Sequence, residues 1–322
     1  MGFELFNIYN GHRKWLLHKD RGIGMNNFKF IALLLMTTFL MGSSFAIVKL
    51  GLPYASPLLL AALRFIIAGI LMAIIVLVFK RPHPKTKAEW LKVLLIGTFQ
   101  TAGVMGCIFL SLRTITASES SILTFTNPLL VVVLATIFTK ARYRSYQWVG
   151  VLLGLIGVII TMGAQIEWKI GIVFGFLSAV FWAIATLLAK KWGVLFDTWV
   201  LSAYQMLFGG LLLLLGSEVL EQPYFIVNGH SLLLLLWLSI FSSIIQFAGW
   251  YYLLQNSDPG KTSAYLFLAP FFGVLTGWIL LDEPLQSSLL VGGLFILVGI
   301  FLVNRNYTSE RKGELIGTIR NN

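Results

Sequence analysis

The stretch LTFTNPLLVVVLATIF, residues 123–138, places an asparagine and a proline inside a segment that otherwise has the composition of a membrane helix. Proline lacks a backbone N–H and crowds the carbonyl four residues before it, so it breaks or kinks a helix. A second stretch, LFLAPFFGVLTGWILL at residues 266–281, has the same form, and its Pro270 lies 142 residues after Pro128. The shared form and the fixed spacing indicate an internal repeat.

Composition identifies the class of protein. Of the 322 residues, 57% are hydrophobic and 11% are charged. Such a chain cannot fold around one aqueous core without exposing a large apolar exterior. Apolar segments of about the length that crosses a bilayer recur along almost the whole chain, at 28–49, 57–79, 91–111, 118–139, 146–163, 170–189, 198–217, 232–254, 262–281 and 287–304. The sequence therefore predicts an all-α polytopic protein with ten transmembrane helices in a lipid bilayer.

Basic residues predict the orientation, because loops that stay cytoplasmic retain lysine and arginine. With the N-terminus inside, 20 of the 24 Lys and Arg residues fall in cytoplasmic segments, and only Lys49, Arg113 and Lys169 lie outside. Arg64 is the one basic residue well inside a membrane segment. Both termini are therefore expected in the cytoplasm, and the net charge of +11 is a topology signal. No nucleic-acid partner is expected, because the basic residues are scattered over loops with no soluble fold to present them.

The two ends of the chain are predicted to be cytoplasmic, with an arm at 1–27 and a tail at 305–322. The first 24 residues lack the apolar core and cleavage site of a signal peptide. They are either an extension ahead of a true start at Met25 or an arm that lies on the membrane surface. Cys107, the only cysteine, falls in the third expected helix, which excludes disulfides and thiolate metal sites.

The repeat can be followed along both halves. A register of 142 residues places Gly150 on Gly292 and Gly157 on Gly299, so that VGVLLGLIGVII overlies VGGLFILVGIFL, and these glycines are expected to serve close helix packing. Nearer the start of each half the offset is 141, which aligns Met41 with Trp182, Lys49 with Lys190, Arg64 with Gln205 and Gly69 with Gly210.

One repeat unit contains five expected helices, at 28–163 and again at 170–304. An odd number of crossings inverts the second copy relative to the first. The two halves are therefore expected to be related by an axis in the membrane plane, which is the architecture of many secondary transporters.

Several of these segments together resemble a known family. They are FLMGSSFAIVK and FWAIATLLAKK in the first and sixth expected helices, LRFIIAG in the second, the two proline-centred helices, LLDEPL with Glu283, and the paired glycine helices. The chain resembles the ten-helix branch of the drug/metabolite transporter superfamily, which is built from two EamA-type repeats, over residues 28–304. One departure is visible: TKARYR has Ala141 where the family usually has an acidic residue that matches Glu283. The resemblance implies a transporter, but members export amino acids, other metabolites or drugs, and some import, so substrate and direction stay open.

The two prolines predict interruptions in mid-membrane. Carbonyls freed near Thr124 and Leu266 must find partners in protein or in a water-lined cavity. This arrangement suits a substrate path, although proline kinks in membrane helices can also serve packing alone. Asn127, beside the first break, can hydrogen-bond a substrate, whereas its counterpart Ala269 cannot.

Polar and aromatic residues within the spans are the candidates for lining that path. Arg64 is an intramembrane charge, which is functional by default; it either contacts substrate or forms a structural ion pair with Glu119. The glutamines can instead hydrogen-bond between helices with no transport role. The candidate substrate-binding residues are Arg64, Gln100, Asn127, Trp182, Tyr204, Gln205, Gln246, Trp250 and Tyr265.

Glu119 is the candidate for proton coupling or for a gate, because it is the only acidic residue expected near the interior-facing end of a span. In the alternative, it pairs with Arg64 or Arg113 at the outer mouth, or faces water, and the protein is a uniporter.

Enzyme functions find little support. The four histidines lie in loops or tails, no set of residues has metal-ligand spacing, and no phosphate-binding glycine loop is present. We therefore expect no cofactor and no catalysis. The sequence predicts a secondary transporter that exports a small metabolite such as an amino acid by alternating access, as a monomer in a bacterial inner membrane. The alternative is a membrane enzyme or a structural membrane partner.

Overall fold

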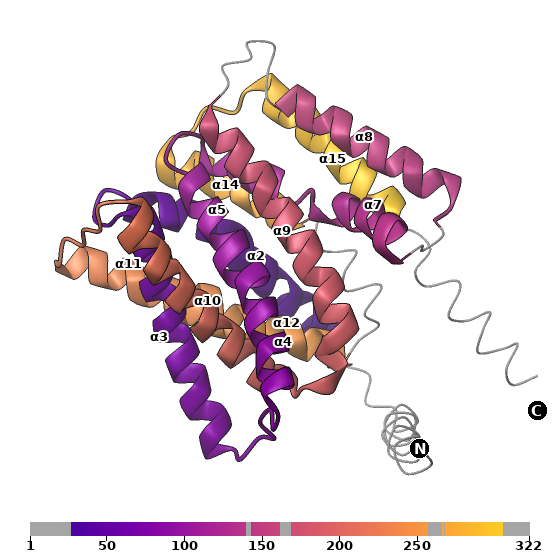
Figure 1. The fold of residues 1–322 in the computed structure, drawn as a ribbon. Coiled ribbons are helices and arrows are strands. Elements are labelled where there is room, and N and C mark those ends of the chain that lie inside the picture. Colours follow the sequence, from indigo (N-terminus) through magenta and orange to yellow (C-terminus); the bar gives the residue numbers. More distant parts are fainter. Residues whose placement is uncertain (1–26, 140–142, 162–168, 257–265, 267, 305–322) are drawn as a thin grey trace, which may run out of the picture.

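The computed structural model describes residues 27–139, 143–161, 169–256, 266 and 268–304, and every regular element in these ranges is a helix (Figure 1). The elements are α2 (Asn27–Gly51), α3 (Pro57–Val78), α4 (Lys87–Gly97), η1 (Thr98–Gly103), α5 (Val104–Ser111), α6 (Ala117–Thr124), α7 (Asn127–Thr139), α8 (Ser145–Thr161), α9 (Ile170–Trp192), η2 (Gly193–Leu195), α10 (Thr198–Leu220), α11 (Gly229–Ser239), η3 (Ile240–Ile245), α12 (Gln246–Asn256), α14 (Leu268–Leu281) and α15 (Ser287–Asn304).

Capping residues explain where several helices begin. The first turn of a helix has backbone N–H groups without an intrahelical acceptor, and short polar side chains satisfy them. Thr86 and Glu89 form a reciprocal capping box at the start of α4. Asp197 accepts hydrogen bonds from two N–H groups at the start of α10, and Asn228 caps α11.

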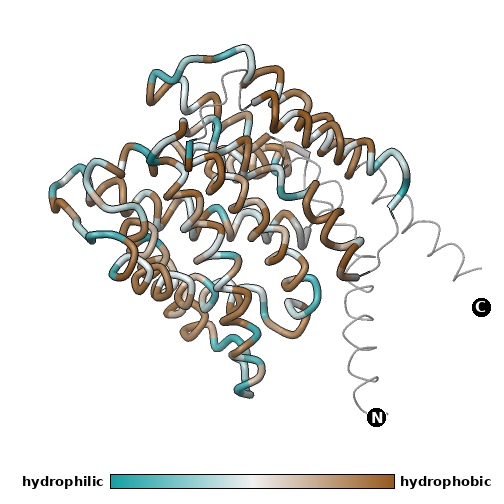
Figure 2. The backbone as a smooth tube through the Cα atoms, turned by 45° about the horizontal axis from the view of Figure 1, so that its top comes forward, coloured by the Kyte–Doolittle hydropathy of each residue, from teal (hydrophilic) through white to brown (hydrophobic). Residues whose placement is uncertain are grey.

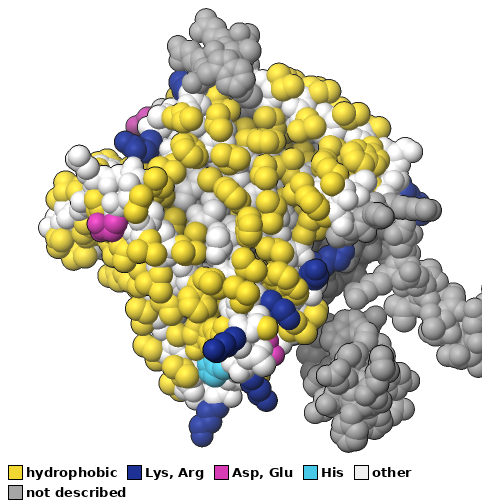
Figure 3. All heavy atoms as spheres, in the orientation of Figure 1, with side chains coloured by type: hydrophobic (Ala, Val, Ile, Leu, Met, Phe, Trp, Pro, Cys, Tyr) yellow, Lys and Arg dark blue, Asp and Glu magenta, His cyan; other side chains and the backbone are white. Residues whose placement is uncertain are grey.

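Each of the ten expected membrane segments coincides with helix over its described residues. Seven helical stretches are long and apolar enough to cross a membrane, while α8, α14 and α15 are apolar but shorter. Ile74, Leu152 and Phe301 are among many large apolar side chains that are more than half exposed. Figure 2 shows hydrophobic helices with hydrophilic turns between them, and Figure 3 shows hydrophobic side chains over most of one face. The protein is therefore a multi-pass integral membrane protein.

Connecting segments meet at two opposite ends of the helices. The backbone N–H of Ser56 donates to the carbonyl of Tyr224 (3.0 Å), so the connection after α2 pairs with the one after α10. At the opposite end, Arg81 after α3 lies 3.4 Å from Asp197 before α10. We call the first the outer end, after the side on which the sequence predicts it, and the second the inner end.

The two repeats pack against each other through equivalent helices. A Cβ at Gly69 of α3 would lie 2.7 Å from the backbone nitrogen of Leu207 in α10, and one at Gly210 would lie 2.8 Å from that of Ile66. Both contacts follow the 141-residue register, so α3 and α10 cross as the two-fold relation requires. The absence of side chains at these glycines lets the backbones approach closely.

The second such pair, α8 with α15, lies side by side at one edge of the molecule (Figure 1). A Cβ at Gly150 would lie 2.7 Å from the carbonyl oxygen of Gly299, and one at Gly157 would lie 2.6 Å from that of Gly292. The four glycines that define the 142-residue register therefore lie where these two helices approach each other closely. Their expected role in close helix packing is confirmed.

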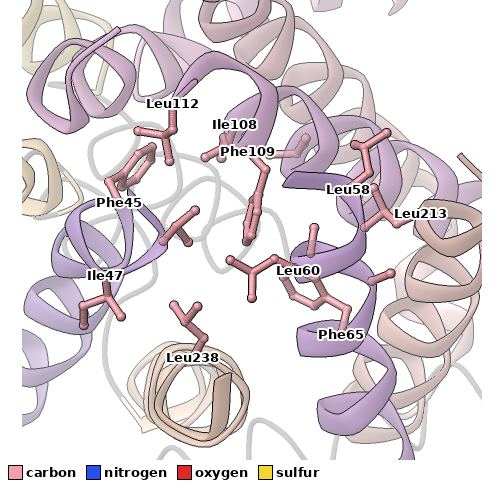
Figure 4. Packing of buried hydrophobic residues seen from close by; sticks show 14 of the residues in the cluster. Phe45, Ile47, Leu58, Leu60, Phe65, Ile108, Phe109, Leu112, Leu213 and Leu238 are labelled. Atoms are coloured by element: carbon pink, nitrogen blue, oxygen red, sulfur yellow. The ribbon is translucent and has the colours of Figure 1, made fainter. Parts of the chain in front are cut away.

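The largest apolar cluster fills the bundle toward the outer end. Figure 4 shows Phe45, Phe65, Phe109 and Leu238 directed into a common centre from different helices. The same cluster includes Leu112 and Ala117, next to the outer connection between α5 and α6. Toward the inner end, the buried residues of α3, α4 and α10 form separate smaller clusters. A further cluster, between α6, α7, α8 and α15, extends from Ile115 near the outer end to Val303 near the inner end. The difference in packing between the two ends is therefore found around α3 and α10.

The interruption expected near Pro128 is present, since α6 ends at Thr124 and α7 begins at Asn127. Pro128 occupies the first turn of α7, where a missing N–H removes no helical hydrogen bond. Pro270 likewise lies in the first turn of α14, which begins at Leu268. The interruption expected ahead of Pro270 falls on 257–265 and 267, outside the described residues.

Two further irregularities are not visible in the sequence pattern. The segments η1 and η3 are π-helical, and Ile240–Ile245 follows Thr98–Gly103 by the same 142 residues. A π-turn is rare, widens the helix and is frequent at functional sites. The repeat therefore includes one π-helix at the same place in each half.

Candidate functional site

Arg64 joins α3 to the π-helix η3. Its Nη2 donates to the carbonyl oxygen of Ser242 (2.7 Å), and its Nε donates to the hydroxyl of Ser243 (2.9 Å). The Ser243 hydroxyl in turn donates to the carbonyl of Leu238 (3.0 Å). A π-turn disrupts the regular carbonyl ladder of an α-helix. The guanidinium, which is only 3% exposed, thus supplies donors to groups of the irregular turn.

Of the two alternatives for Arg64, the ion pair with Glu119 is not formed. One oxygen of Glu119, Oε2, accepts hydrogen bonds from the backbone N–H (2.8 Å) and hydroxyl (2.9 Å) of Thr116, which completes the capping box of α6. Ion pairs are formed by Lys49 with Glu283 and by Arg81 with Asp197. The hydrogen-bond partners of Arg64 on η3 are neutral, because the crossing of α3 brings it to Ser242 and Ser243.

The equivalent contact in the other half involves Gln205 of α10 and the start of η1. A Cβ at Gly97, directly before η1, would lie 2.7 Å from the Gln205 carbonyl oxygen. Gln205 is buried, and Gln100 lies within η1 itself. In the first pair, Gln246 directly follows η3 and is also buried. Four candidate residues therefore lie at the two equivalent π-helices, Arg64 and Gln246 at one and Gln100 and Gln205 at the other.

A third group of candidates lies at the break between α6 and α7. Asn127 is the first residue of α7 and is buried. The ring of Phe125, within the break, lies 5.4 Å from that of Trp182 in α9 and 6.1 Å from that of Phe45 in α2. A hydroxyl contact of 2.8 Å between Thr124 and Ser178 also joins the break to α9. An amide and three aromatic rings are thus placed around one irregular turn.

The remaining aromatic candidates lie elsewhere. Tyr204 packs at the inner end, where its hydroxyl is 3.3 Å from Nδ1 of His83 and its ring is 4.8 Å from that of Trp90. The connection after α3 folds back onto α10 at this point. Trp250 is half-buried on α12, which packs against α2. Tyr265 lies outside the described residues.

Sequence reasoning missed a buried carboxylate at the outer end. Glu283 lies between the expected helices at 262–281 and 287–304, yet it is only 6% exposed. Its Oε1 accepts from the backbone N–H of Ala117 (2.6 Å), and its Oε2 accepts from the N–H (3.0 Å) and hydroxyl (2.7 Å) of Ser118. Lys49 Nζ lies 3.5 Å from Oε1. The signal that could have identified it is the LLDEPL motif, which carries the family resemblance.

A hollow of about 560 Å³ opens beside this group at the outer end. Its wall combines basic, acidic and apolar side chains. The lining residues are Lys49, Leu52, Pro53, Ser56, Pro57, Leu112, Arg113, Glu221, Gln222 and Tyr224. Glu221 also accepts hydrogen bonds from the backbone N–H of Leu59 (3.0 Å) and the hydroxyl of Ser217 (2.8 Å), so it links α10 to the start of α3.

Comparison with known proteins gives two matches to one family. Residues 28–163 and 169–305 each match the family described as the EamA-like transporter family. An uncharacterized transporter of Archaeoglobus fulgidus is 30% identical over 281 residues, which cover 86% of this chain and 99% of that one. The uncharacterized transporter YvbV of Bacillus subtilis is 28% identical, covering 88% of this chain and 94% of that one.

More distant likenesses extend to plants and to a solved structure. A chloroplastic WAT1-related protein of Arabidopsis thaliana is 27% identical, covering 87% of this chain and 70% of that one. A crystal structure superposes with a TM-score of 0.61 and covers 84% of this chain and 96% of that chain at 21% identity. At this level of identity the likeness concerns the fold alone.

Proposed function

Because the chain belongs to the EamA-like transporter family, we propose that it exports a small polar or amphipathic metabolite, such as an amino acid, by alternating access between its two repeats. The chain is a membrane transporter, with a small-molecule substrate and the lipid bilayer as its partners, and transporters of this kind are not enzymes. Substrate class, direction and mechanism are the parts that we propose.

The observation that carries the mechanism is the two-fold crossing of α3 and α10 in a bundle whose ends are packed differently. Gly69 and Gly210 place the two helices against each other in equivalent ways. Around α3 and α10, the largest apolar cluster fills the outer end, whereas the inner end holds smaller separate clusters. Two equivalent halves can exchange conformations, and the exchange closes one end as it opens the other. We propose that the present structure is the form closed at the outer end.

We place the solute between the two π-helices and the break of α6 and α7. The amides of Gln100, Asn127 and Gln246 can hydrogen-bond a polar solute, and the rings of Phe125 and Trp182 can contact its apolar part. Irregular backbone in a membrane protein belongs where it lines a cavity or is buried in protein. The site thus combines the three irregular segments described above.

Orientation and assembly belong to the same proposal. The excess of Lys and Arg at the inner end favours a cytoplasmic location for that end and for both termini, in a bacterial inner membrane. One chain carries both repeats of the cycle, which favours a monomer as the working unit. Export then delivers the solute through the outer end.

Reconstitution tests the function directly. Purified protein in liposomes is expected to accelerate the exchange of labelled amino acids across the bilayer. Parallel assays with labelled nucleosides and cationic drugs distinguish the substrate classes, and protein-free liposomes give the background. The double variant Asn127→Ala with Gln246→Ala should lose flux while it still purifies as a monodisperse protein. Background flux for every solute class would refute the proposal.

A further inference from the structure

We propose that the charged carboxylate of Glu283 is a latch that holds the outer end closed. The latch consists of Glu283, Lys49, Ala117 and Ser118. The inference rests on the proposed function, because only a protein that alternates between two forms needs its outer end to open.

The first element of the latch is the start of α6. The first N–H groups of a helix have no acceptor within the helix and form the positive end of its dipole, so a carboxylate there is stabilised in its charged form. Glu283 accepts from the first two of them, at Ala117 and Ser118, and from the Ser118 hydroxyl, over 2.6–3.0 Å. Hydrogen bonds to a charged acceptor are about twice as strong as neutral ones.

The second element of the latch is Lys49 at the end of α2. Its Nζ lies 3.5 Å from Glu283 Oε1 and donates to the carbonyl of Ile115 at 2.6 Å. Lys49, Ile115 and Ser118 all belong to the first repeat, whereas Glu283 belongs to the second. The latch thus ties the second repeat to two separate segments of the first.

The space around Glu283 is closely filled. A Cβ at Gly277 of α14 would lie 2.4 Å from Glu283 Oε2 and 2.6 Å from the Ser118 hydroxyl. Directly below, the apolar cluster that contains Ala117 and Leu112 fills the outer half of the bundle. Opening this end requires α6 to separate from α14, and that separation breaks the hydrogen bonds of the latch.

At the inner end, the ion pair of Arg81 with Asp197 joins the two repeats at 3.4 Å, and its side chains are 47% and 17% exposed, against 30% and 7% for Lys49 and Glu283. Exposed ion pairs contribute little to stability because water and salt screen them. The more buried latch at the outer end is therefore the stronger of these two ion pairs.

The other acidic groups near the latch do not join the two repeats. Glu119 caps its own helix, and Asp282, beside Glu283, is exposed.

A reporter cysteine measures opening without any substrate. Ser121 lies one turn below Ser118 on α6, is fully buried, and its hydroxyl has no partner among the described residues. The parent protein carries Ser121→Cys and Cys107→Ala and is placed in lipid nanodiscs, where both ends meet the same buffer. Its rate of reaction with a charged maleimide reports how often the closed packing opens.

Glu283→Gln is expected to raise this rate by at least about tenfold at neutral pH, the change in population that loss of one charge-assisted hydrogen bond produces. Lys49→Met, which leaves the cap of α6 intact, should raise it less. Asp282→Asn is the matched control, because it removes the adjacent exposed charge and should leave the rate unchanged. If the Glu283→Gln and parent proteins are both monodisperse and react with the maleimide at equal rates, the latch proposal is refuted.

Because no solute is present, a failed latch leaves the liposome flux unaffected, whereas a failed transport proposal appears as absence of flux in the wild-type protein.

Discussion

Arg64 shows how one buried side chain acquires its role from a partner that is distant in sequence. An arginine in a membrane segment must find hydrogen-bond acceptors, because an unsatisfied charge there is costly. It finds them in the backbone carbonyl of Ser242 and the hydroxyl of Ser243, both within a π-helix. Its hydrogen bonds therefore favour a positioning role at η3. Contact with substrate stays a prediction.

The Arg64→Lys variant tests this role while keeping the charge constant. Lysine is a point donor that cannot reproduce the planar fork of arginine, so one of the two acceptors on η3 loses its partner. The free energy of unfolding is expected to fall by about 1.5–3 kcal/mol, the contribution of a hydrogen bond to a charged group. The measurement is thermal unfolding in detergent, with the exposed Lys190→Arg as control. An unchanged stability together with weaker solute binding would favour substrate contact instead.

Helix pairs determine how closely the two repeats can approach, and the glycines of α10 illustrate two different situations. Gly210 faces the backbone of α3, with a would-be Cβ 2.8 Å from the nitrogen of Ile66. Gly216, on the same helix, would place its Cβ 3.8 Å from a methyl group of Leu58, which is an ordinary contact. A methyl group added at Gly210 therefore tests close packing between helices, whereas one added at Gly216 tests helix propensity alone.

Gly210→Ala and Gly216→Ala should therefore act in opposite directions. Backbone atoms cannot move aside as a flexible side chain can, so Gly210→Ala must push α3 and α10 apart and should lower the unfolding midpoint. Alanine is more favourable than glycine within a helix by about 1 kcal/mol, and Gly216→Ala should leave the midpoint unchanged or raise it. Thermal unfolding of the two variants side by side checks this. Equal effects would mean that the crossing tolerates a methyl group.

The break between α6 and α7 is a second feature that concerns the helices themselves. Pro128 cannot donate a hydrogen bond to the carbonyl of Thr124, which keeps the two helices separate. Pro128→Ala restores that donor and should let one continuous helix form, with unchanged or higher stability. We expect slower solute flux, because the irregular turn beside Asn127 is lost. Pro57→Ala, at the first residue of α3, is the control for removal of a first-turn proline. Full flux in Pro128→Ala would exclude a transport role for the break.

The molecule as a whole has two chemically different ends, and the distribution of basic residues predicts which one faces the cytoplasm. In a background with Cys107→Ala, a cysteine at the exposed Gln222 should react with an impermeant thiol reagent added to intact cells. A cysteine at the exposed Lys85 should react only after the cells are opened. Reaction at residue 85 alone would reverse the orientation and make the latch cytoplasmic.

Properties that depend on one segment at a time could be determined from the sequence alone. The lengths of the apolar segments predicted where the helices lie, and the glycines at 150, 157, 292 and 299 predicted both the repeat and its closest helix contact. The break at Pro128 was predicted because proline acts on its own backbone. Each of these follows from local composition or from the comparison of the chain with itself.

Contacts between side chains of different helices were decided only by the tertiary structure. Arg64 binds a π-helix rather than Glu119, Tyr204 lies at the inner end, and Glu283 is buried against α6 although its own segment reads as a loop. The rotation and crossing of each helix set these contacts, and they depend on packing against several neighbours at once. A local pattern contains the length and the apolar character of a helix, but not which polar group on another helix its side chains will meet.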